Sequence, residues 1–242
     1  MSKPLVIIPT YNERENVEAI IRAVFSLHIP FSVLIVDDNS PDGTNLIVKE
    51  LQHEFVGRLF LEIRAEKEGL GKAYIHGFKW ALARNFDYIF EMDADFSHNP
   101  KDLLKLYRAC ELGADMAVGS RYLKGINVVN WPLKRVMLSL GASYYVKLIT
   151  GMSIKDPTAG FVCYHRRVLE AIDLEQVKFV GYAFQIEMKF KAYKKKFTIK
   201  EVSIIFKDRE QGYSKMSSSI IKEGILGVLT LKFNSMFNKN KF

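Results

Sequence analysis

Two short, fully apolar runs near the N-terminus, residues 5–8 and 33–36, most constrain what this chain can fold into. Neither run has the polar alternation of a half-exposed strand, and continuous apolar runs are typical of parallel strands covered on both faces. Between them, residues 15–27 space their apolar side chains as one face of a helix. This strand–helix–strand alternation predicts an α/β fold with a Rossmann-like, mostly parallel sheet flanked by helices.

The pattern continues along the first half of the chain and changes after it. Residues 88–92 and 115–119 are predicted strands, and Pro100 stands where the first turn of a helix is expected. In the second half we expect a helix over 136–149, a strand over 198–206, a polar stretch over 207–219, and a last helix with an apolar run at 225–231.

Composition fits a folded globular chain. The 242 residues are 48% apolar and 26% charged, which is ordinary for a globular protein. This length suits one domain, 1–242, and the change of pattern divides it into two halves, 1–120 and 121–242. Two cysteines indicate a reducing compartment, and no signal-peptide layout or stretch of about 20 apolar residues is present. We therefore expect a cytoplasmic protein.

The net charge of +8 lies entirely at the C-terminal end. Residues 1–185 hold 22 basic and 22 acidic residues, whereas residues 186–242 hold 13 basic and 5 acidic ones. Such an excess favours a polyanionic partner, such as nucleic acid, an anionic membrane surface or a phosphorylated ligand. A solvated helix face with a charged tail explains the charge equally well.

Three acidic or polar segments follow predicted strands, at residues 9–13, 37–44 and 93–95. Ligands of open α/β sheets bind beyond the carboxyl ends of the strands, and the sheet brings these segments to one edge. A single Asp or Asn there would be explained by a turn or a helix cap. Three together predict an acidic pocket.

Asp93 and Asp95 are separated by one small residue after an apolar strand. Two close carboxylates repel each other unless a cation lies between them. Magnesium takes one or two protein carboxylates together with substrate phosphates. The pair therefore predicts a divalent metal site that binds a phosphorylated substrate.

Two other nucleotide-binding motifs are excluded. The first strand is followed by PTYNE, where a dinucleotide site needs a glycine-rich fingerprint. The segment EGLGK at 68–72 resembles a phosphate loop, but Glu66 and Ala73 stand where that motif needs Gly and Ser or Thr. We expect Gly69 and Gly71 to shape a tight turn before a helix.

These segments resemble family 2 glycosyltransferases of the GT-A fold, which transfer the sugar of a nucleoside-diphosphate sugar to an acceptor. The later ones are similar to the branch that makes polyprenol-phosphate or dolichol-phosphate mannose. The resemblance covers most of the chain and rests on PTYNEREN (9–16), DDNSPDGT (37–44), GLGKAYIHG (69–77), MDADFSH (92–98), GSRY (119–122), WPLKR (131–135), DPTAGF (156–161), GYAFQIEM (181–188) and DREQGYSK (208–215).

The resemblance implies that residues 1–120 form the nucleotide-sugar-binding half and residues 121–242 the acceptor-binding half with a basic C-terminal segment. It also implies roles for the acidic segments. The nucleoside is expected to contact Pro9, Tyr11, Glu13, Val36 and Asp38. The diphosphate and a Mg²⁺ or Mn²⁺ ion are expected to contact Asp93, Ala94 and Asp95. Ser97 stands where the family often has Gln as a third metal contact, and a hydroxyl is a weaker ligand. His98 is expected to serve in a turn or in packing, because carboxylates and phosphates suit magnesium better.

The resemblance also assigns the basic residues. Arg121 and Arg135 are expected to bind the acceptor phosphate, and Arg209 and Lys215 the donor diphosphate, since the planar arginine fork matches phosphate oxygens. Each taken singly is also explained as ordinary surface charge. Asp95, Arg121 and Arg135 are the predicted catalytic residues.

The implied reaction is an inverting transfer of mannose from GDP-mannose to a polyprenyl phosphate. The chain resembles short members without transmembrane helices, with residues 136–149 and 220–237 as amphipathic acceptor-side helices. We expect it at the cytoplasmic face of a membrane, bound peripherally or through a membrane partner subunit. A buried core helix explains 136–149 as well.

Two alternatives stay open: another donor such as UDP-glucose, and a non-catalytic nucleotide-sugar-binding subunit. Nucleic acid is not an expected partner, because no aromatic platform is interleaved with the basic tail.

Overall fold

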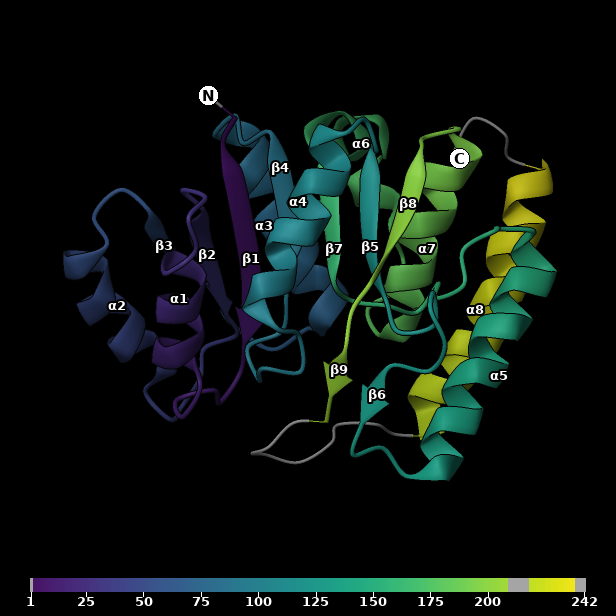
Figure 1. Ribbon diagram of the computed structural model, residues 1–242, viewed down its shortest axis with the longest axis horizontal. Helices are drawn as coiled ribbons and strands as arrows, with labels where there is room; N and C mark the ends of the chain where they lie inside the picture. Colours follow the sequence, from purple (N-terminus) through teal and green to yellow (C-terminus); the bar gives the residue numbers. More distant parts are fainter. Residues whose placement is uncertain (1, 209–217, 238–242) are drawn as a thin grey trace.

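The computed structural model describes residues 2–208 and 218–237. One seven-stranded sheet forms its centre, with the strands in the order β3-β2-β1-β4-β7-β5-β8 (Figure 1). The elements up to the fifth strand are β1 (Pro4–Thr10), α1 (Val17–Phe25), β2 (Ser32–Asp37), α2 (Thr44–Glu54), β3 (Leu59–Ile63), α3 (Leu70–Ala83), β4 (Tyr88–Glu91), the 3₁₀ turn η1 (Pro100–Asp102), α4 (Leu103–Glu111) and β5 (Met116–Ser120).

The remaining elements complete the sheet and extend it on one side. They are β6 (Val128–Val129), α5 (Leu133–Thr150), β7 (Val162–His165), α6 (Arg166–Ala171), the 3₁₀ turn η2 (Leu174–Gln176), α7 (Tyr182–Lys194), β8 (Ile199–Ser203), β9 (Phe206–Lys207) and α8 (Ser218–Phe237). The short strands β6 and β9 pair in parallel as a second, two-stranded sheet.

Apolar side chains fill both faces of the sheet. One core cluster joins the strands to α1, α2 and α4, and a second joins them to α3, α6 and α7. The two apolar runs, residues 5–8 and 33–36, lie wholly inside the protein, and none of their side chains has any exposed surface. The expected helix-flanked, mostly parallel sheet is confirmed.

One strand departs from the parallel arrangement. The strand β7 lies between β4 and β5 and is antiparallel to both. Neither β7 nor β3 was predicted from the sequence. The sheet therefore takes strands from both halves of the chain, 1–120 and 121–242.

The predicted strand over 198–206 divides in two. β8 pairs with β5 and ends at Ser203, and the chain then leaves the main sheet before β9 pairs with β6. The other predicted strands and helices are present with ends shifted by a few residues. Pro100 begins η1 as expected, with the Asn99 side chain accepting a hydrogen bond from the Lys101 amide.

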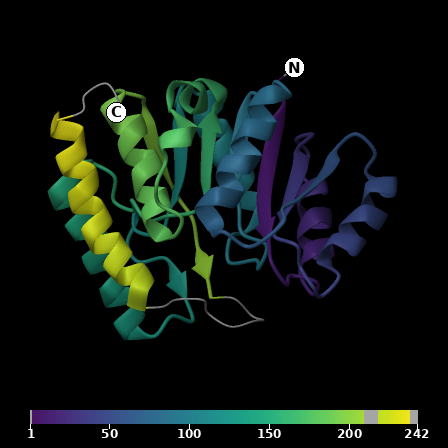
Figure 2. The ribbon, with the colours of Figure 1, turned by 180° about the vertical axis from the view of Figure 1, so that it is seen from behind.

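A pair of long helices extends beyond the β8 edge of the sheet. Helices α5 and α8 lie side by side there in both views (Figures 1 and 2), and α8 also packs against α7. A third apolar cluster, which includes Val146, Phe190 and Val228, joins the three helices. No helix in the described part of the chain is long and apolar enough to cross a membrane.

Candidate active site

The strand order predicts a ligand-binding crevice between the carboxyl ends of β1 and β4. From β1 the chain proceeds to β2 and β3 on one side, and then returns to β4 on the other. Adjacent parallel strands whose connections run in opposite directions leave an opening at their carboxyl ends, where ligands of such sheets bind. The loops that follow β1 and β4 hold residues 11–13 and 93–95, so the sheet brings these predicted site segments to one edge (Figure 1).

Asp37 supports the loop after β2. It is fully buried and accepts hydrogen bonds from the Thr10 hydroxyl (2.8 Å), the Ser40 amide (2.8 Å) and the Ser40 hydroxyl (2.6 Å). These bonds tie the end of β1 to the end of β2. Asp37 therefore has a structural role.

Asp38, the predicted nucleoside contact, faces a residue that the sequence did not single out. Arg64 follows β3, and its Nε lies 3.4 Å from a carboxylate oxygen of Asp38, with both side chains more than nine-tenths buried. Burial raises the pKa of Asp38, and the Arg64 charge partly offsets this. The sequence did not single out Arg64 because β3 was not predicted, and Arg64 was therefore not recognised as lying at the end of a strand.

The loop after β1 places the other nucleoside candidates. The Lys67 ammonium lies 4.2 Å from the centre of the Tyr11 ring, a cation–π contact that sequence reasoning also missed. The Glu13 amide donates to the Thr44 hydroxyl, and the Glu13 carboxylate accepts from the Asn16 side chain. Pro9 and Val36 lie in β1 and β2, opposite each other in register.

In the acidic loop after β4, residues 93–98, backbone amides donate hydrogen bonds to side chains of the same loop. The Ser97 amide donates to Asp95 at 3.0 Å, and the Asp93 amide donates to Nδ1 of His98 at 3.2 Å. Ala94, between the two carboxylates, is buried. Among the described residues, the Ser97 hydroxyl is buried without a hydrogen-bond partner. A cavity of about 480 Å³ opens beside Asp95 and Ser97.

The side-chain oxygens of Asp93, Asp95 and Ser97 are suitable ligands for a hard divalent cation. Two carboxylates and an unsatisfied hydroxyl offer only oxygen, which Mg²⁺ and Mn²⁺ prefer. No group of three or more His, Cys, Asp or Glu in residues 2–208 and 218–237 is arranged to hold a metal. The remaining ligands would therefore come from substrate phosphates and water.

His98 is a packing residue. Its side chain is buried, stacks on Phe161 at 4.8 Å between ring centres, and meets Phe206 edge-on. Burial lowers the pKa of His98 to about 4, so the ring is neutral at physiological pH. A neutral ring whose Nδ1 accepts from the Asp93 amide supports the acidic loop, as expected.

The two predicted acceptor arginines lie around one indole ring. The Arg135 guanidinium is 4.0 Å, and that of Arg121 is 5.5 Å, from the centre of the Trp131 ring. Each arginine also binds a carboxylate: Arg121 holds Asp156 with two bonds of 2.6 and 2.7 Å, and Arg135 holds Asp208 with two bonds of 2.8 Å.

The other two predicted basic contacts have no structural description. Arg209 and Lys215 lie outside the described residues, so their contacts with the donor diphosphate stay predictions. Gly69 directly precedes α3 and has a φ of +104°, a backbone conformation that favours glycine, in keeping with the expected turn. Gly71 differs from expectation, because it lies inside the first turn of α3, where a Cβ would come within 2.7 Å of the Phe179 carbonyl oxygen. Close packing, rather than a turn, requires glycine there.

A family model for glycosyl transferase family 2 matches residues 5–173. The chain belongs to this family. The matched region begins in β1 and runs past the acidic loop and both halves of the Arg121–Asp156 pair, so the family pattern contains the β1–β4 crevice.

Two named relatives match nearly the whole family 2 chain. A polyprenol monophosphomannose synthase of Mycolicibacterium smegmatis is 46% identical over 226 residues, covering 93% of this chain and 85% of the relative. An undecaprenyl-phosphate mannosyltransferase of Micrococcus luteus is 42% identical over 224 residues, covering 93% and 91%.

Solved structures share the fold at much lower identity. Glucosyl-3-phosphoglycerate synthase of Mycobacterium tuberculosis in complex with Mn²⁺ and UDP-glucose superposes with a TM-score of 0.68 at 14% identity, covering 97% of this chain and 78% of that one. The same enzyme with UDP gives a TM-score of 0.69 at 13% identity, covering 96% and 80%. This likeness confirms the GT-A fold.

Proposed function

We propose that this family 2 enzyme transfers mannose from GDP-mannose to a polyprenyl phosphate, giving polyprenyl-phosphate mannose with inversion at the anomeric carbon. The observation that carries the proposal is the match to two relatives named for this chemistry, at 46% and 42% identity over 93% of the chain. The acidic edge between β1 and β4 supports it, because the proposed nucleoside contacts and the proposed cation ligands both lie at this edge.

In the proposed reaction, an oxygen of the acceptor phosphate forms the new bond to the anomeric carbon. The bond from that carbon to the donor diphosphate breaks, and its electron pair leaves with GDP. A phosphate monoester is largely ionised near neutral pH, its second pKa being about 6, so no strong general base is needed. Positioning of the two phosphates supplies most of the catalysis.

Each residue set has a defined part. Asp93, Asp95 and Ser97 would hold Mg²⁺ or Mn²⁺ against the donor diphosphate, where the ion neutralises charge on the departing nucleotide. Arg121 and Arg135 would orient the acceptor phosphate. Pro9, Tyr11, Glu13, Val36 and Asp38 would hold the nucleoside, while Arg209 and Lys215 would hold the diphosphate.

We further propose that α5 and α8 rest on the cytoplasmic face of the membrane that holds the acceptor. Both helices expose large apolar side chains that the described part of the chain does not cover: Leu133, Met137, Leu138, Tyr144, Leu148, Leu226, Leu229, Phe233, Met236 and Phe237. Exposed apolar side chains next to lysines are typical of helices that lie in a membrane interface.

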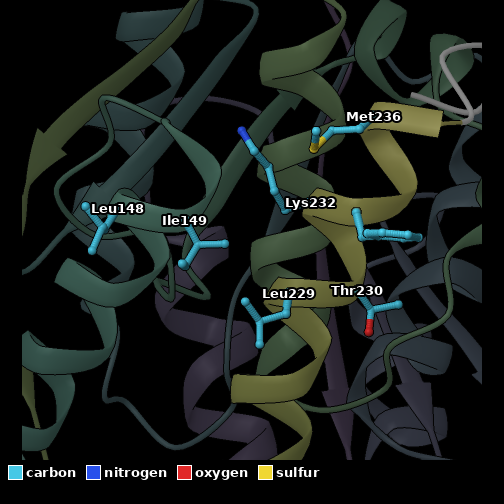
Figure 3. Close-up of a pocket in the computed structure, with 7 residues that line it drawn as sticks. Leu148, Ile149, Leu229, Thr230, Lys232 and Met236 are labelled. Carbon is cyan, nitrogen blue, oxygen red and sulfur yellow. The ribbon is translucent and has the colours of Figure 1, made fainter.

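The two helices also leave an apolar hollow between them. A pocket of about 560 Å³ lies between the C-terminal half of α8 and the end of α5, where Leu229 faces Ile149 and the Lys232 side chain leans toward α5 (Figure 3). At its other end, α5 begins two residues after Trp131 and carries Arg135 in its first turn. A prenyl chain lying along α5 would thus bring its phosphate to the arginines.

Purified protein with a short polyprenyl phosphate, Mg²⁺ and either GDP-mannose or UDP-glucose tests the reaction, with lipid-linked hexose detected by mass spectrometry. We expect product from GDP-mannose. EDTA treatment or the Asp95→Ala substitution should lower its amount at least a hundredfold, and adding Mg²⁺ or Mn²⁺ in excess of EDTA should restore product formation by the wild type. Product from UDP-glucose alone would overturn the donor. GDP binding without any product would favour a non-catalytic subunit.

A further inference from the structure

A line of hydrogen-bonded polar groups crosses the protein interior between β4 and α7. The Tyr164 hydroxyl and the Gln185 amide each donate to Glu91, at 3.2 and 2.6 Å. The Lys189 ammonium donates to the Gln185 side-chain oxygen (3.1 Å) and to the Ala159 carbonyl (2.6 Å). All four side chains are at most 2% exposed. We call this set the buried polar line.

The buried polar line joins two parts of the candidate site. At one end, Glu91 is the last residue of β4, two positions before Asp93 in the acidic loop. At the other end, Ala159 belongs to the turn over residues 156–160. That turn carries Asp156 and Thr158, and both accept hydrogen bonds from the Arg121 guanidinium.

The turn is fixed from two sides. The Glu201 carboxylate in β8 accepts hydrogen bonds from the amides of Lys155 and Asp156, at 2.8 and 2.9 Å. Lys189 in α7 holds the far end through Ala159. The guanidinium of Arg121 is therefore oriented by a carboxylate whose own backbone depends on both anchors.

A lysine in this position is costly to bury. Removing an ammonium group from water is strongly unfavourable unless acceptors replace the lost hydration. The three oxygens within 3.2 Å of Lys189 provide that replacement, and one belongs to the turn that holds Asp156. An apolar side chain would fill the same space without fixing that carbonyl.

We propose that Lys189 is a positioning residue for the acceptor site: by holding the Ala159 carbonyl it fixes the 156–160 turn and thereby orients Arg121, while Gln185 and Glu91 align this turn with the acidic loop. The inference rests on the proposed function, in which Arg121 binds the acceptor phosphate.

Two lysines of α7 allow a matched comparison. Lys191 is also buried, but it forms an ion pair with Glu187 and donates to the Gln176 carbonyl, in the segment before α7. We expect Lys189→Met to raise the KM for a short polyprenyl phosphate at least tenfold, with the Kd for GDP unchanged within twofold. Lys191→Met should leave both constants within twofold. Equal effects of the two variants on KM would overturn the proposal.

Amide hydrogen exchange tests the same idea without substrate. In Lys189→Met, exchange at residues 156, 158 and 159 should accelerate at least tenfold, and in Lys191→Met it should not. Unchanged exchange in Lys189→Met would overturn the inference, whereas a wild-type enzyme that makes no lipid-linked mannose would overturn the proposed function instead. If Lys189→Met does not fold, the double variant Glu91→Gln with Lys189→Met replaces it, because that variant leaves neither charge unpaired. Its exchange rates are then compared with those of Glu91→Gln alone.

Discussion

Asp38 and Arg64 form an ion pair in which both side chains are more than nine-tenths buried. In the described residues, one carboxylate oxygen of Asp38 and the Nη1 of Arg64 are buried without a hydrogen-bond partner. Removing one member of such a pair leaves a buried charge uncompensated, which commonly costs about 3–5 kcal/mol. The geometry of Asp38 therefore depends on a residue from the neighbouring strand β3.

Replacing Arg64 with Met should weaken GDP binding at least tenfold, because Asp38 loses the charge that stabilises its ionised form. Arg58, at the other end of β3, donates to the Phe31 carbonyl and provides the control. Isothermal titration of GDP into Arg64→Met and Arg58→Met would measure the difference. Equal affinities in the two variants would contradict the role of Arg64.

Lys189 should also give stability a distinct pH dependence. Burial lowers the pKa of Lys189 to about 8, although Glu91 and Asp156 act in the opposite direction. Between pH 8 and the ordinary lysine value of about 10.4, the unfolded chain binds more protons, so this group makes stability rise with pH by up to about 1.4 kcal/mol per unit. Urea unfolding at pH 7.5 and 9.5 should show this gain in the wild type relative to Lys189→Met. Identical pH dependences would contradict it.

At the scale of elements, α3 depends on close contact with α7 and the segment before it. A Cβ on Gly71 would lie 2.7 Å from the Phe179 carbonyl oxygen and 3.0 Å from the Phe184 ring. By contrast, a Cβ on Gly141 in α5 would meet no atom within 4 Å in the described part of the chain, apart from its own helical turn. Close packing therefore requires glycine at position 71, whereas the surroundings of position 141 leave room for a larger side chain.

We expect Gly71→Ala to lower the free energy of unfolding by about 1–3 kcal/mol, because overpacking shifts the backbone of Phe179. Gly141→Ala should raise it by up to about 1 kcal/mol, since alanine loses less backbone entropy in a helix. Denaturant titration of both variants measures these changes. Stabilisation by Gly71→Ala would show that the 178–181 segment yields easily.

At the scale of the whole molecule, the exposed apolar helices lie at one end. Leu138 and Leu148 in α5 are 49% and 69% exposed, and Leu46 in α2, at the opposite end of the sheet, is 59% exposed (Figure 1). All three have similar exposure, so their substitution should affect folding alike. Only the α5 pair lies on the side that we propose to face the membrane.

The double variant Leu138→Glu with Leu148→Glu should reduce co-sedimentation with anionic phospholipid vesicles more than tenfold. Each buried leucine contributes about 1.5–3 kcal/mol to such binding, and each added carboxylate is repelled by the anionic surface. Leu46→Glu should leave vesicle binding unchanged. Wild-type binding by the double variant would mean that another surface meets the membrane.

The sequence by itself determined the features that depend on local pattern. The runs at 5–8 and 33–36 are buried strands because their apolar side chains have no polar alternation to expose. The acidic segments lie at one edge because each directly follows a strand, and parallel strands end on the same side. His98 was expected in a turn or in packing because its chemistry suits magnesium poorly, and its buried ring stacks on Phe161.

Only the tertiary structure decided which distant residues meet. Strand β7 enters between β4 and β5 in the reverse direction, and four residues carry too little pattern to predict that. The partners of Asp38 and Arg121, which are Arg64 and Asp156, come from separate segments of the chain. Lys189 reaches the Ala159 carbonyl across 30 residues. Local pattern fixes which segments become strands and helices, but the pairing of buried charges depends on strand order and packing, because a desolvated charge is stable only where folding brings its partner.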